Sequence, residues 1–345
     1  MSYGCHPQHP AVSGSGDCAA LLEMKEFIMS KKVLITSRSF GKIGDSAREI
    51  LLRAGIEITN ISVDFDQVEF ERIIPEFDAL IIGAQDFSEA DMERCPNLKI
   101  ICKHGVGLDN IHLNKAKELG IAVCNAPGTN SNAVADFTFG LMLSVSREIS
   151  HSACLVRQGV WKSHIGEDVC GKTLGLLGFG AIAKGVARRA RGFDMKILAY
   201  DPFVTQLPEE FAGWVDLVSK EDVISSCDFL SIHIPLTPET KNSISAPELA
   251  QMKQGAYVIN TARGGIVDET ALYDALVSGH LNGAAMDVVE NEPMAADHPL
   301  LSLDNVVVTP HIGMYSKEAI NAVSLICAEN VVACLRGGQM INRVV

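Results

Sequence analysis

The sequence predicts an α/β protein with two Rossmann-like halves, each built on a parallel sheet. Short runs rich in β-branched residues alternate with amphipathic helical segments from Lys32 onward, and several of these segments end on a glycine, as helices often do. The apolar runs are nearly continuous, which is typical of parallel strands that are buried on both faces. Because the alternation runs through the chain twice, we expect two sheets with helical crossovers.

The expected strands fall into two groups. The first sheet takes residues 33–36, 56–63, 79–83, 98–102 and 121–125, and the second takes 173–178, 196–201, 229–234, 256–261, 283–289 and 305–310. In the second group, helices are expected to begin near Gly180, Ala246 and Asp268, where strand patterns give way to helical ones.

A helix expected over residues 130–149 joins the two halves. Its apolar side chains spread around the whole circumference; they are Phe137, Phe139, Leu141, Met142, Leu143 and Val145. A helix of this kind has to be buried on all sides. Two environments remain open for it, namely the core of its own domain and the contact with a second subunit in a homodimer.

Composition narrows the class of protein. The chain has 345 residues, of which 47% are hydrophobic and 21% charged, and this length suggests about two domains. The net charge of −13 argues against a nucleic-acid partner, which would need a basic face. No apolar run approaches the roughly 20 residues of a membrane helix, so we expect no membrane partner.

The ten cysteines show no C-x-x-C pair and no zinc-binding spacing. Several lie in apolar runs, such as Cys102 and Cys124, so we expect buried, reduced thiols in a cytoplasmic protein and no bound metal. Residues 1–30 are rich in small and polar residues and lack the pattern of a signal peptide. We expect them to form a disordered extension, of which the first 28 residues are not needed for activity.

A glycine motif predicts a dinucleotide site. Gly178-Phe-Gly180-Ala-Ile-Ala183 directly follows an expected strand and opens an expected helix. Gly178 permits a tight turn, and Gly180 lets a pyrophosphate approach the backbone at the helix N-terminus. Alanine at position 183 is a tolerated variant of the third glycine.

Asp201 indicates which dinucleotide binds. It ends the next expected strand, 23 residues after Gly178, where an acid accepts hydrogen bonds from the adenosine ribose. A 2′-phosphate would meet a like charge there, and no arginine follows in Pro202-Phe203. NAD is therefore favoured over NADP. The alternative interpretation is an ordinary aspartate in a turn.

A catalytic set follows at the ends of later strands. Three segments that each end a strand of the second sheet carry Arg263, then the acids Asp287, Glu290 and Glu292, and then His311. Ligands bind at such strand ends in open α/β sheets. Histidine can exchange a proton near neutral pH, and a carboxylate such as Glu292 can stabilise its charged form and orient the ring. An arginine can bind a substrate carboxylate with two hydrogen bonds. Taken alone, each residue also has a structural interpretation, such as a turn or a helix cap.

Several blocks together resemble the D-isomer-specific 2-hydroxyacid dehydrogenase family, and its phosphoglycerate dehydrogenase-like branch in particular. They are KHGVGLDNI (103–111), NAPGTNSNAVAD (125–136), GKTLGLLGFGAIA (171–183), HIPLTPET (233–240), NTARGGIVDE (260–269), MDVVENEP (286–293) and TPHIG (309–313). The resemblance covers roughly residues 31–336. It implies a flavodoxin-like substrate domain of residues 31–126 and 315–345, with an NAD-binding domain of residues 127–314 inserted into it. It also favours a homodimer.

The resemblance further implies roles for individual residues. Arg263 and His311 would be catalytic, with Glu292 as the acid partner of the histidine. The implied cofactor contacts are Gly178, Gly180, Ala181, Ile182, Asp201, Ile234, Thr261, Ala262, Arg263, Asp287, His311 and Met314. The implied substrate contacts are Lys103, Val106, Gly107 and Arg263, with the backbone of Val106 and Gly107 binding the substrate carboxylate.

Some positions depart from the family pattern. Lys103 stands where phosphoglycerate dehydrogenases often have arginine, and we expect His104 to add a second positive group for a distal phosphate. Met314-Tyr315-Ser316 replaces the small residues that are usual after PHIG, which suggests a narrower pocket. The chain ends at Val345, so the appended regulatory domain of many phosphoglycerate dehydrogenases is not expected.

The expected activity is NAD-dependent interconversion of a D-2-hydroxyacid and a 2-oxoacid. D-3-phosphoglycerate is the favoured substrate, and glyoxylate, hydroxypyruvate or another small oxoacid is the alternative. A formate dehydrogenase would carry glutamine in place of Glu292, while phosphite remains open. A nucleotide-sensing regulator similar to the corepressors on this fold is a remote alternative, to which only the Met-Tyr-Ser after PHIG points.

Overall fold

The computed structural model describes residues 30–61 and 66–345, and the contacts within the chain divide it into two compact units. Unit 1 comprises the chain up to Asn125 together with Ser324–Val345, and unit 2 comprises Ala126–Val323. The first boundary lies next to the predicted one, whereas the second lies inside a helix instead of at residues 314 and 315. The expectation of disorder before Ser30 lies outside the described residues.

Unit 1 is built on a five-stranded parallel sheet. Its strands lie in the order β2-β1-β3-β4-β5, which is the flavodoxin-like order and confirms the expected fold. The strands are β1 (Lys31–Ile35), β2 (Ile56–Asn60), β3 (Ala79–Ile82), β4 (Ile100–Lys103) and β5 (Ala122–Cys124). β2 ends before the expected residue 63, and residues 62 and 63 are not among those described.

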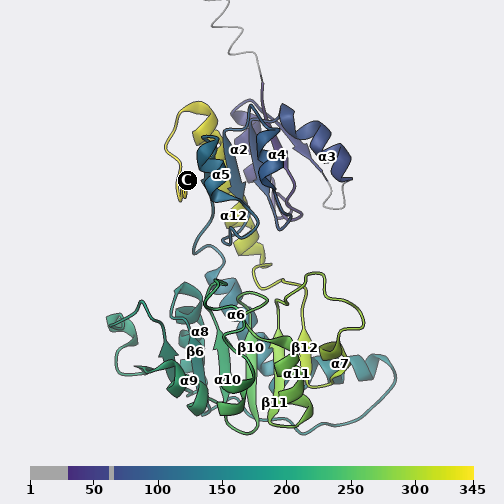
Figure 1. Cartoon of the computed structure of the whole chain (residues 1–345), viewed down its shortest axis with the longest axis vertical. Coiled ribbons are helices and arrows are strands. Elements are labelled where there is room, and N and C mark those ends of the chain that lie inside the picture. The colour runs from purple at the N-terminus through teal and green to yellow at the C-terminus, as the bar shows by residue number, and fades with distance from the viewer. Residues whose placement is uncertain (1–29, 62–65) are drawn as a thin grey trace, which may run out of the picture. The chain divides into compact units, whose positions relative to one another are not determined.

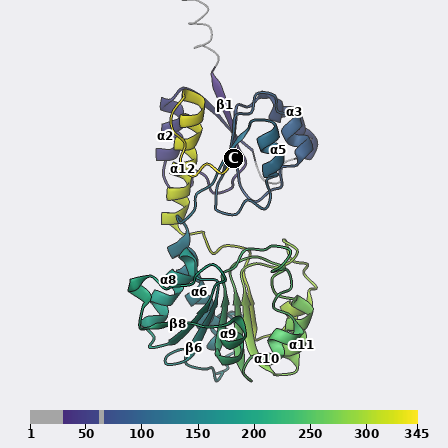
Figure 2. The same ribbon diagram turned by 60° about the vertical axis from the view of Figure 1, so that its left-hand side comes forward.

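Helices cover both faces of this sheet (Figure 2). On one face, α2 (Ser46–Arg53) lies beside α12 (Lys317–Arg336), and Arg336 donates a hydrogen bond to the carbonyl of Ala54 (Nη2–O 2.6 Å). The other face is covered by α3 (Gln67–Ile73), η1 (Ile74–Glu76), α4 (Glu89–Glu93) and α5 (Leu113–Glu118).

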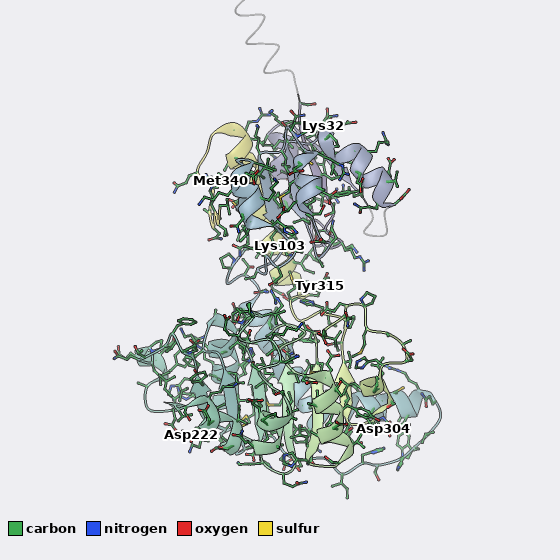
Figure 3. All side chains as sticks on the ribbon, viewed as in Figure 1. Lys32, Lys103, Asp222, Asp304, Tyr315 and Met340 are labelled. Atoms are coloured by element: carbon green, nitrogen blue, oxygen red, sulfur yellow. The ribbon has the colours of Figure 1, made fainter. Side chains whose placement is uncertain are left out.

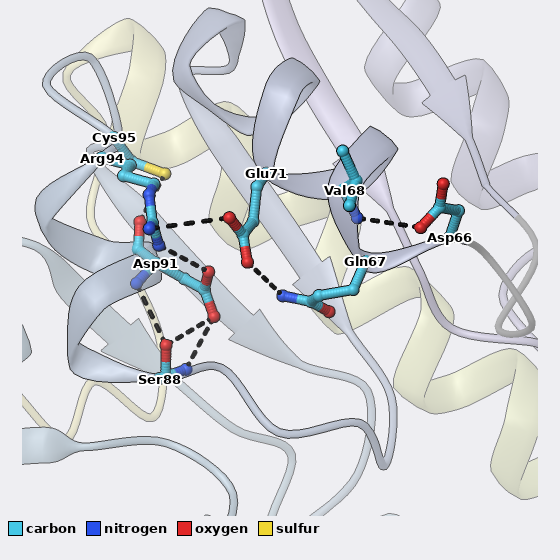
Figure 4. Close-up of polar contacts among 8 residues, drawn as sticks. All are labelled: Asp66, Gln67, Val68, Glu71, Ser88, Asp91, Arg94 and Cys95. Atoms are coloured by element: carbon cyan, nitrogen blue, oxygen red, sulfur yellow. Dashed lines mark hydrogen bonds and ion pairs between the residues drawn. The ribbon is translucent and has the colours of Figure 1, made fainter.

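Side-chain caps set the starts of α3 and α4 (Figure 4). Asp66 accepts a hydrogen bond from the backbone N–H of Val68 (3.0 Å), and Ser88 forms a capping box with Asp91. These bonds satisfy N–H groups that have no partner within the helix. Arg94 then lies 3.6 Å from the carboxylate of Asp91 and 3.6 Å from that of Glu71, which ties the two short helices together.

Unit 2 is built on a seven-stranded parallel sheet with the order β12-β11-β10-β9-β6-β7-β8. The strands are β6 (Thr173–Leu177), β7 (Lys196–Tyr200), β8 (Val215–Leu217), β9 (Phe229–Ile232), β10 (Ala256–Asn260), β11 (Leu281–Met286) and β12 (Val306–Val308). The strand order reverses between β6 and β9, and open α/β sheets bind ligands at such a switch point. β8 was not expected, because three residues give no periodic signal.

Two layers of helices enclose the unit 2 sheet (Figures 1 and 2). One face carries α6 (Ser131–Ser146) and α8 (Ala181–Arg191), and the other carries α9 (Lys220–Ser226), α10 (Ala246–Gln251) and α11 (Glu269–Val277). The remaining elements are α7 (Ile149–Arg157), η2 (Glu209–Phe211) and η3 (Pro299–Ser302). The helix starts predicted near Gly180, Ala246 and Asp268 are confirmed.

The helix expected over residues 130–149 is shorter than predicted and is not buried on all sides. α6 ends at Ser146, and α7 begins at Ile149. Along α6, Asp136 and Gly140 are exposed, while Phe137 and Leu143 are only partly buried. The chain itself therefore leaves one stripe of the helix uncovered, and its contact with a second subunit stays a prediction.

α12 corrects the expectation that no apolar stretch approaches the length of a membrane span. By length and composition, this described helix is long and apolar enough to cross a membrane, with a mean hydropathy of 1.5. However, 44% of that stretch is buried in the structure, and Cys327 contacts the carbonyl of Lys103 at the end of β4 (Sγ–O 3.4 Å). Core helices of globular domains have the same composition.

Candidate active site

The dinucleotide motif lies at the switch point of the unit 2 sheet. Gly178 follows β6 with a φ of +90°, and a Cβ atom there would lie 2.5 Å from the carbonyl oxygen of His233. Only glycine fits such a position. Gly180 differs, because a Cβ atom there would meet no atom within 4 Å. The space in front of Gly180 is therefore open to a ligand.

The N-terminus of α8 faces this loop without a side-chain cap. Its first N–H groups have no partner within the helix and carry a partial positive charge. Ala181 is exposed and Ile182 is half-buried at this end. A phosphate group suits this arrangement.

Asp201 lies beside the glycine loop, just after β7. Its Oδ2 accepts a hydrogen bond from the N–H of Phe179 (2.8 Å), and its Oδ1 accepts one from the N–H of Phe203 (2.9 Å). Each oxygen keeps a further lone pair with which it can accept a ribose hydroxyl. The open glycine, the uncapped helix and the fixed carboxylate together fit NAD.

A histidine and a carboxylate meet on the segments that follow β12 and β11. His311 Nδ1 lies 2.9 Å from Glu292 Oε2, and both side chains are nearly half exposed. Burial raises the pKa of Glu292, but the hydrogen bond and charge of His311, the N–H of Val289 and the charge of Arg263 outweigh burial and lower it. Glu292 is therefore a carboxylate at neutral pH. It orients the ring so that His311 Nε2 faces away and can exchange a proton.

Asp287 holds the segment that carries His311. Its carboxylate accepts hydrogen bonds from the hydroxyl of Thr309 (2.6 Å) and from the N–H groups of Ile312 (2.9 Å) and Gly313 (2.8 Å). His311 has a φ of +52°, which is unfavourable for a residue other than glycine, and these bonds stabilise it. Asp287 was expected to contact the cofactor. Because it is 2% exposed and both its oxygens are bonded within the chain, that contact stays a prediction.

Arg263 lies in a braced turn after β10. The Asn260 side chain accepts a hydrogen bond from the N–H of Ala262 (3.1 Å) and donates one to the carbonyl of Arg263 (2.9 Å). A Cβ atom on Gly264 would lie 1.9 Å from the carbonyl oxygen of Val289, so the Arg263 turn packs directly on the segment that leads to Glu292. Asn260 and Gly264 were not among the predicted site residues, since their place beside Arg263 is their only signal in the sequence.

The other expected cofactor contacts also lie at the ends of strands. Ile234 follows β9, and its Cγ2 atom would lie 3.1 Å from a Cβ atom on Gly178. The hydroxyl of Thr261 is hydrogen-bonded to that of Thr138 in α6 (2.9 Å), and Met314 is half-buried shortly after His311. The cofactor contacts of Ile234, Thr261 and Met314 stay predictions.

The expected substrate contacts belong to unit 1. Lys103 ends β4, and its Nζ donates to the carbonyl of Gly83 (2.7 Å) and to the side chain of Asn110 (2.6 Å); Figure 3 labels this lysine. In the described part of the chain, the N–H groups of Val106 and Gly107 form no hydrogen bond. Adjacent N–H groups of this kind suit a carboxylate.

The prediction that His104 adds a positive group for a phosphate is wrong. Its side chain is 4% exposed, its Nδ1 lies 3.0 Å from the Ser37 hydroxyl, and its Nε2 lies 2.9 Å from the Ser324 hydroxyl. Burial, followed by the charge of Lys103, lowers the pKa of His104 to about 4. The ring is therefore neutral at physiological pH. Sequence position alone could not reveal that hydroxyl groups surround it.

Comparison with known proteins agrees with this geometry. Residues 139–313 match the model of the D-isomer specific 2-hydroxyacid dehydrogenase, NAD binding domain. A hydroxypyruvate reductase of Thermotoga maritima is 42% identical over 83% of the chain and 94% of its own length. The chain belongs to the D-isomer-specific 2-hydroxyacid dehydrogenase family. Members of this family are NAD-dependent oxidoreductases, and NAD is the cofactor of the matched domain.

Relatives within the family differ in their substrates. A D-3-phosphoglycerate dehydrogenase of Archaeoglobus fulgidus is 39% identical over 88% of the chain, and the chain spans 58% of its length. A solved glyoxylate reductase from Paecilomyes thermophila is 30% identical, with a TM-score of 0.80 over 92% of this chain and 99% of that one. The family therefore includes enzymes that are named for different 2-hydroxyacids and 2-oxoacids.

Proposed function

We propose that the chain interconverts a small D-2-hydroxyacid and its 2-oxoacid with NAD(H). The observation that carries the proposal is the 2.9 Å contact between His311 Nδ1 and Glu292 Oε2, in the same unit as the dinucleotide motif. Bound NAD(H) would supply or accept the hydride.

The residues of the chain have separate tasks in this proposal. His311 Nε2 protonates the oxygen of the oxoacid or takes the proton of the hydroxyacid. Glu292 stabilises the imidazolium and keeps the ring oriented. Arg263 binds the substrate carboxylate and stabilises charge on the reacting oxygen. The N–H groups of Val106 and Gly107 provide a further contact for the carboxylate.

D-3-phosphoglycerate is the substrate that we propose first. Its support is the likeness to phosphoglycerate dehydrogenases and the ammonium of Lys103 at the end of β4. A second candidate is hydroxypyruvate or glyoxylate. The neutral, buried His104 favours it, because only Lys103 of the two expected phosphate contacts remains charged. The hydrogen bonds from Lys103 to Gly83 and Asn110 also favour the second candidate, because they already use donors of the ammonium group.

NADH oxidation would be measured with 3-phosphohydroxypyruvate, hydroxypyruvate, glyoxylate, pyruvate and 2-oxoglutarate. A preference for the phosphorylated substrate, lost in Lys103→Met, would support the first candidate. A preference for an unphosphorylated oxoacid would support the second. No turnover of any of them, with NADH still bound, would refute the proposed reaction and favour a nucleotide-sensing regulator.

His311→Gln tests the mechanism. General acid–base catalysis contributes about 100- to 10,000-fold, so we expect kcat to fall by about that factor while NADH affinity changes little. His280→Gln is the control, because the hydrogen bonds of this histidine within the described residues go to Gln254 and to the carbonyl of Leu249, away from the proposed catalytic set. Near-normal turnover of His311→Gln would show that another group exchanges the proton.

The proposed assembly is a homodimer in the cytoplasm. Its support is the uncovered stripe of α6 together with an exposed apolar segment after α7, in which Trp161 is 92% and Ile165 100% exposed. Large exposed apolar patches commonly mark protein interfaces.

A further inference from the structure

Three potential metal ligands gather where α7 begins. Glu148 immediately precedes α7, His151 lies in its first turn, and His164 lies in the segment that follows the helix. Each offers one ligand atom, and these atoms lie within 4.8 Å of one another. The dinucleotide motif, the His311–Glu292 pair and Arg263 do not include any of them.

The contacts of these side chains leave ligand capacity unused. His164 Nδ1 lies 2.7 Å from Glu148 Oε2, and the ring of His151 meets that of His164 edge-on with 5.2 Å between centroids. A cation bound by His164 Nδ1 and Glu148 would replace their direct contact, whereas His164 Nε2 is shielded from solvent, has no hydrogen-bond partner among the described residues and is directed away from the carboxylate. Two imidazoles beside one carboxylate form the donor set of many zinc sites that keep an open position.

A fourth side chain lies beside the cluster. Asp304, which Figure 3 labels, lies with Oδ1 3.5 Å from His151 Nδ1. Metal-bound histidines commonly direct one ring nitrogen at a carboxylate, and this leaves the other nitrogen for the metal. Glu148, His151 and Asp304 also line a cavity of about 260 Å³ between α7 and β12, so two of the three ligands border an open space.

We propose that Glu148, His151 and His164 bind a divalent transition-metal ion, Zn²⁺ being the best fit, with Asp304 orienting His151. Neutral imidazole and carboxylate suit Zn²⁺ in tetrahedral geometry, and three protein ligands leave one position for water. Cysteine spacing gives no sign of this site, because its ligands follow the pattern E-x2-H-x12-H. Bound metal would fix the exposed segment of Trp161 and Ile165 to α7.

Metal analysis of the full chain tests the site. The protein is treated with chelator, freed of it and dialysed against Zn²⁺, and bound zinc is measured per chain. We expect His151→Ala and His164→Ala each to bind one zinc fewer than the parent. The parent carries Cys154→Ser and Cys170→Ser, because exposed thiols also bind zinc. NADH binding confirms that each variant is folded.

His112→Ala is the matched control. His112 also pairs with a glutamate, at 3.5 Å from Glu89, but is not part of the cluster of three ligands. It should keep all of the bound zinc. Asp304→Asn should weaken zinc binding by about 10- to 100-fold, as loss of an outer-shell partner usually does. This variant replaces the histidine variants as the test of the site if either alanine variant fails to fold.

Cobalt provides a second readout. Co²⁺ in the parent should show visible absorption bands without the charge-transfer band of a thiolate, and these bands should be absent from His164→Ala. Equal zinc content in the parent and in both histidine variants would overturn the proposal, as would a cobalt spectrum that His164→Ala leaves unchanged. The metal measurements do not depend on the proposed reaction, so either can fail alone.

Discussion

The left-handed backbone of His311 depends on a buried carboxylate at the end of a neighbouring strand. Asp287 accepts hydrogen bonds from Thr309, Ile312 and Gly313 on both sides of the histidine. A Cβ atom on Gly313 would lie 3.0 Å from Asp287 Oδ2, so a side chain there would press on the carboxylate. Asp287 therefore stabilises the backbone at His311, whereas Glu292 orients the imidazole ring.

A substitution at Gly180 should weaken cofactor binding without affecting folding. A Cβ atom there meets nothing in the chain, so Gly180→Val should fold normally. The added side chain would occupy the space in front of the α8 N-terminus, where the pyrophosphate is expected. We expect NADH affinity to fall by about tenfold or more, because each 1.4 kcal/mol of lost binding is a factor of ten. Fluorescence titration with NADH and thermal unfolding would measure both effects.

Gly178→Ala is the comparison for that variant. A Cβ atom at Gly178 would lie 2.5 Å from the carbonyl of His233, and its φ is positive. It should lower the unfolding temperature as well as NADH affinity. A Gly180→Val protein that binds NADH as tightly as the parent would show that the pyrophosphate does not lie at this turn.

At the scale of elements, the site is built where neighbouring parallel strands end. β9, β10, β11 and β12 are successive neighbours in the sheet, so Ile234, Arg263, Asp287 and His311 emerge at one edge. The Arg263 turn then packs on the segment after β11, where Gly264 meets the Val289 carbonyl.

Gly264→Ala should disrupt that packing. A Cβ atom 1.9 Å from a carbonyl oxygen forces the backbone to move, and overpacking of this severity costs about 3 kcal/mol or more. Because Arg263 and Glu292 lie on the displaced segments, kcat should also fall. Chemical denaturation and steady-state kinetics would measure the two effects.

Gly180→Ala provides the stability control for the same chemical change. A Cβ atom at Gly180 would meet nothing within 4 Å, so the free energy of unfolding should change far less than in Gly264→Ala. An unaltered free energy of unfolding in Gly264→Ala would contradict the close approach of the two segments.

At the scale of the whole molecule, two parallel sheets of different strand order share one chain. Unit 1 has the flavodoxin-like order and unit 2 the Rossmann order with an additional strand. The chain enters unit 2 at Ala126 and returns to unit 1 within α12. From the family resemblance, we predicted that the chain returns to unit 1 before α12, at residues 314 and 315. The contacts place it inside, because the side chains of Ser324 and Cys327 bond to unit 1.

The homodimer is tested on the intact chain. Light scattering should report twice the mass of one chain, and replacing Trp161 and Ile165 by lysine should shift the protein towards the monomer, because a charge cannot be buried cheaply in an apolar interface. Val277→Lys is the control, since Val277 is a 59% exposed apolar residue on α11. A monomeric parent protein would refute the proposed assembly.

The sequence by itself predicted the α/β class and the two sheets, which the structure confirms, and it indicated the dinucleotide motif and the residues of the proposed catalytic set. These follow from local signals, since strand periodicity, glycine spacing and residue type are readable within a few residues of each other. Family likeness added Glu292 as the partner of His311, and the 2.9 Å contact between them agrees.

Only the tertiary structure decided what surrounds each side chain. His104 is neutral because packing of several segments, including Ser324 of α12, buries its ring and lowers its pKa. Asp287 holds the His311 segment because the chain after β12 folds onto its carboxylate. Glu148, His151 and His164 became neighbours because the segment after α7 turns back on the helix. Burial and partners depend on packing between segments that are separate in the chain, and packing sets the charge and orientation on which function depends.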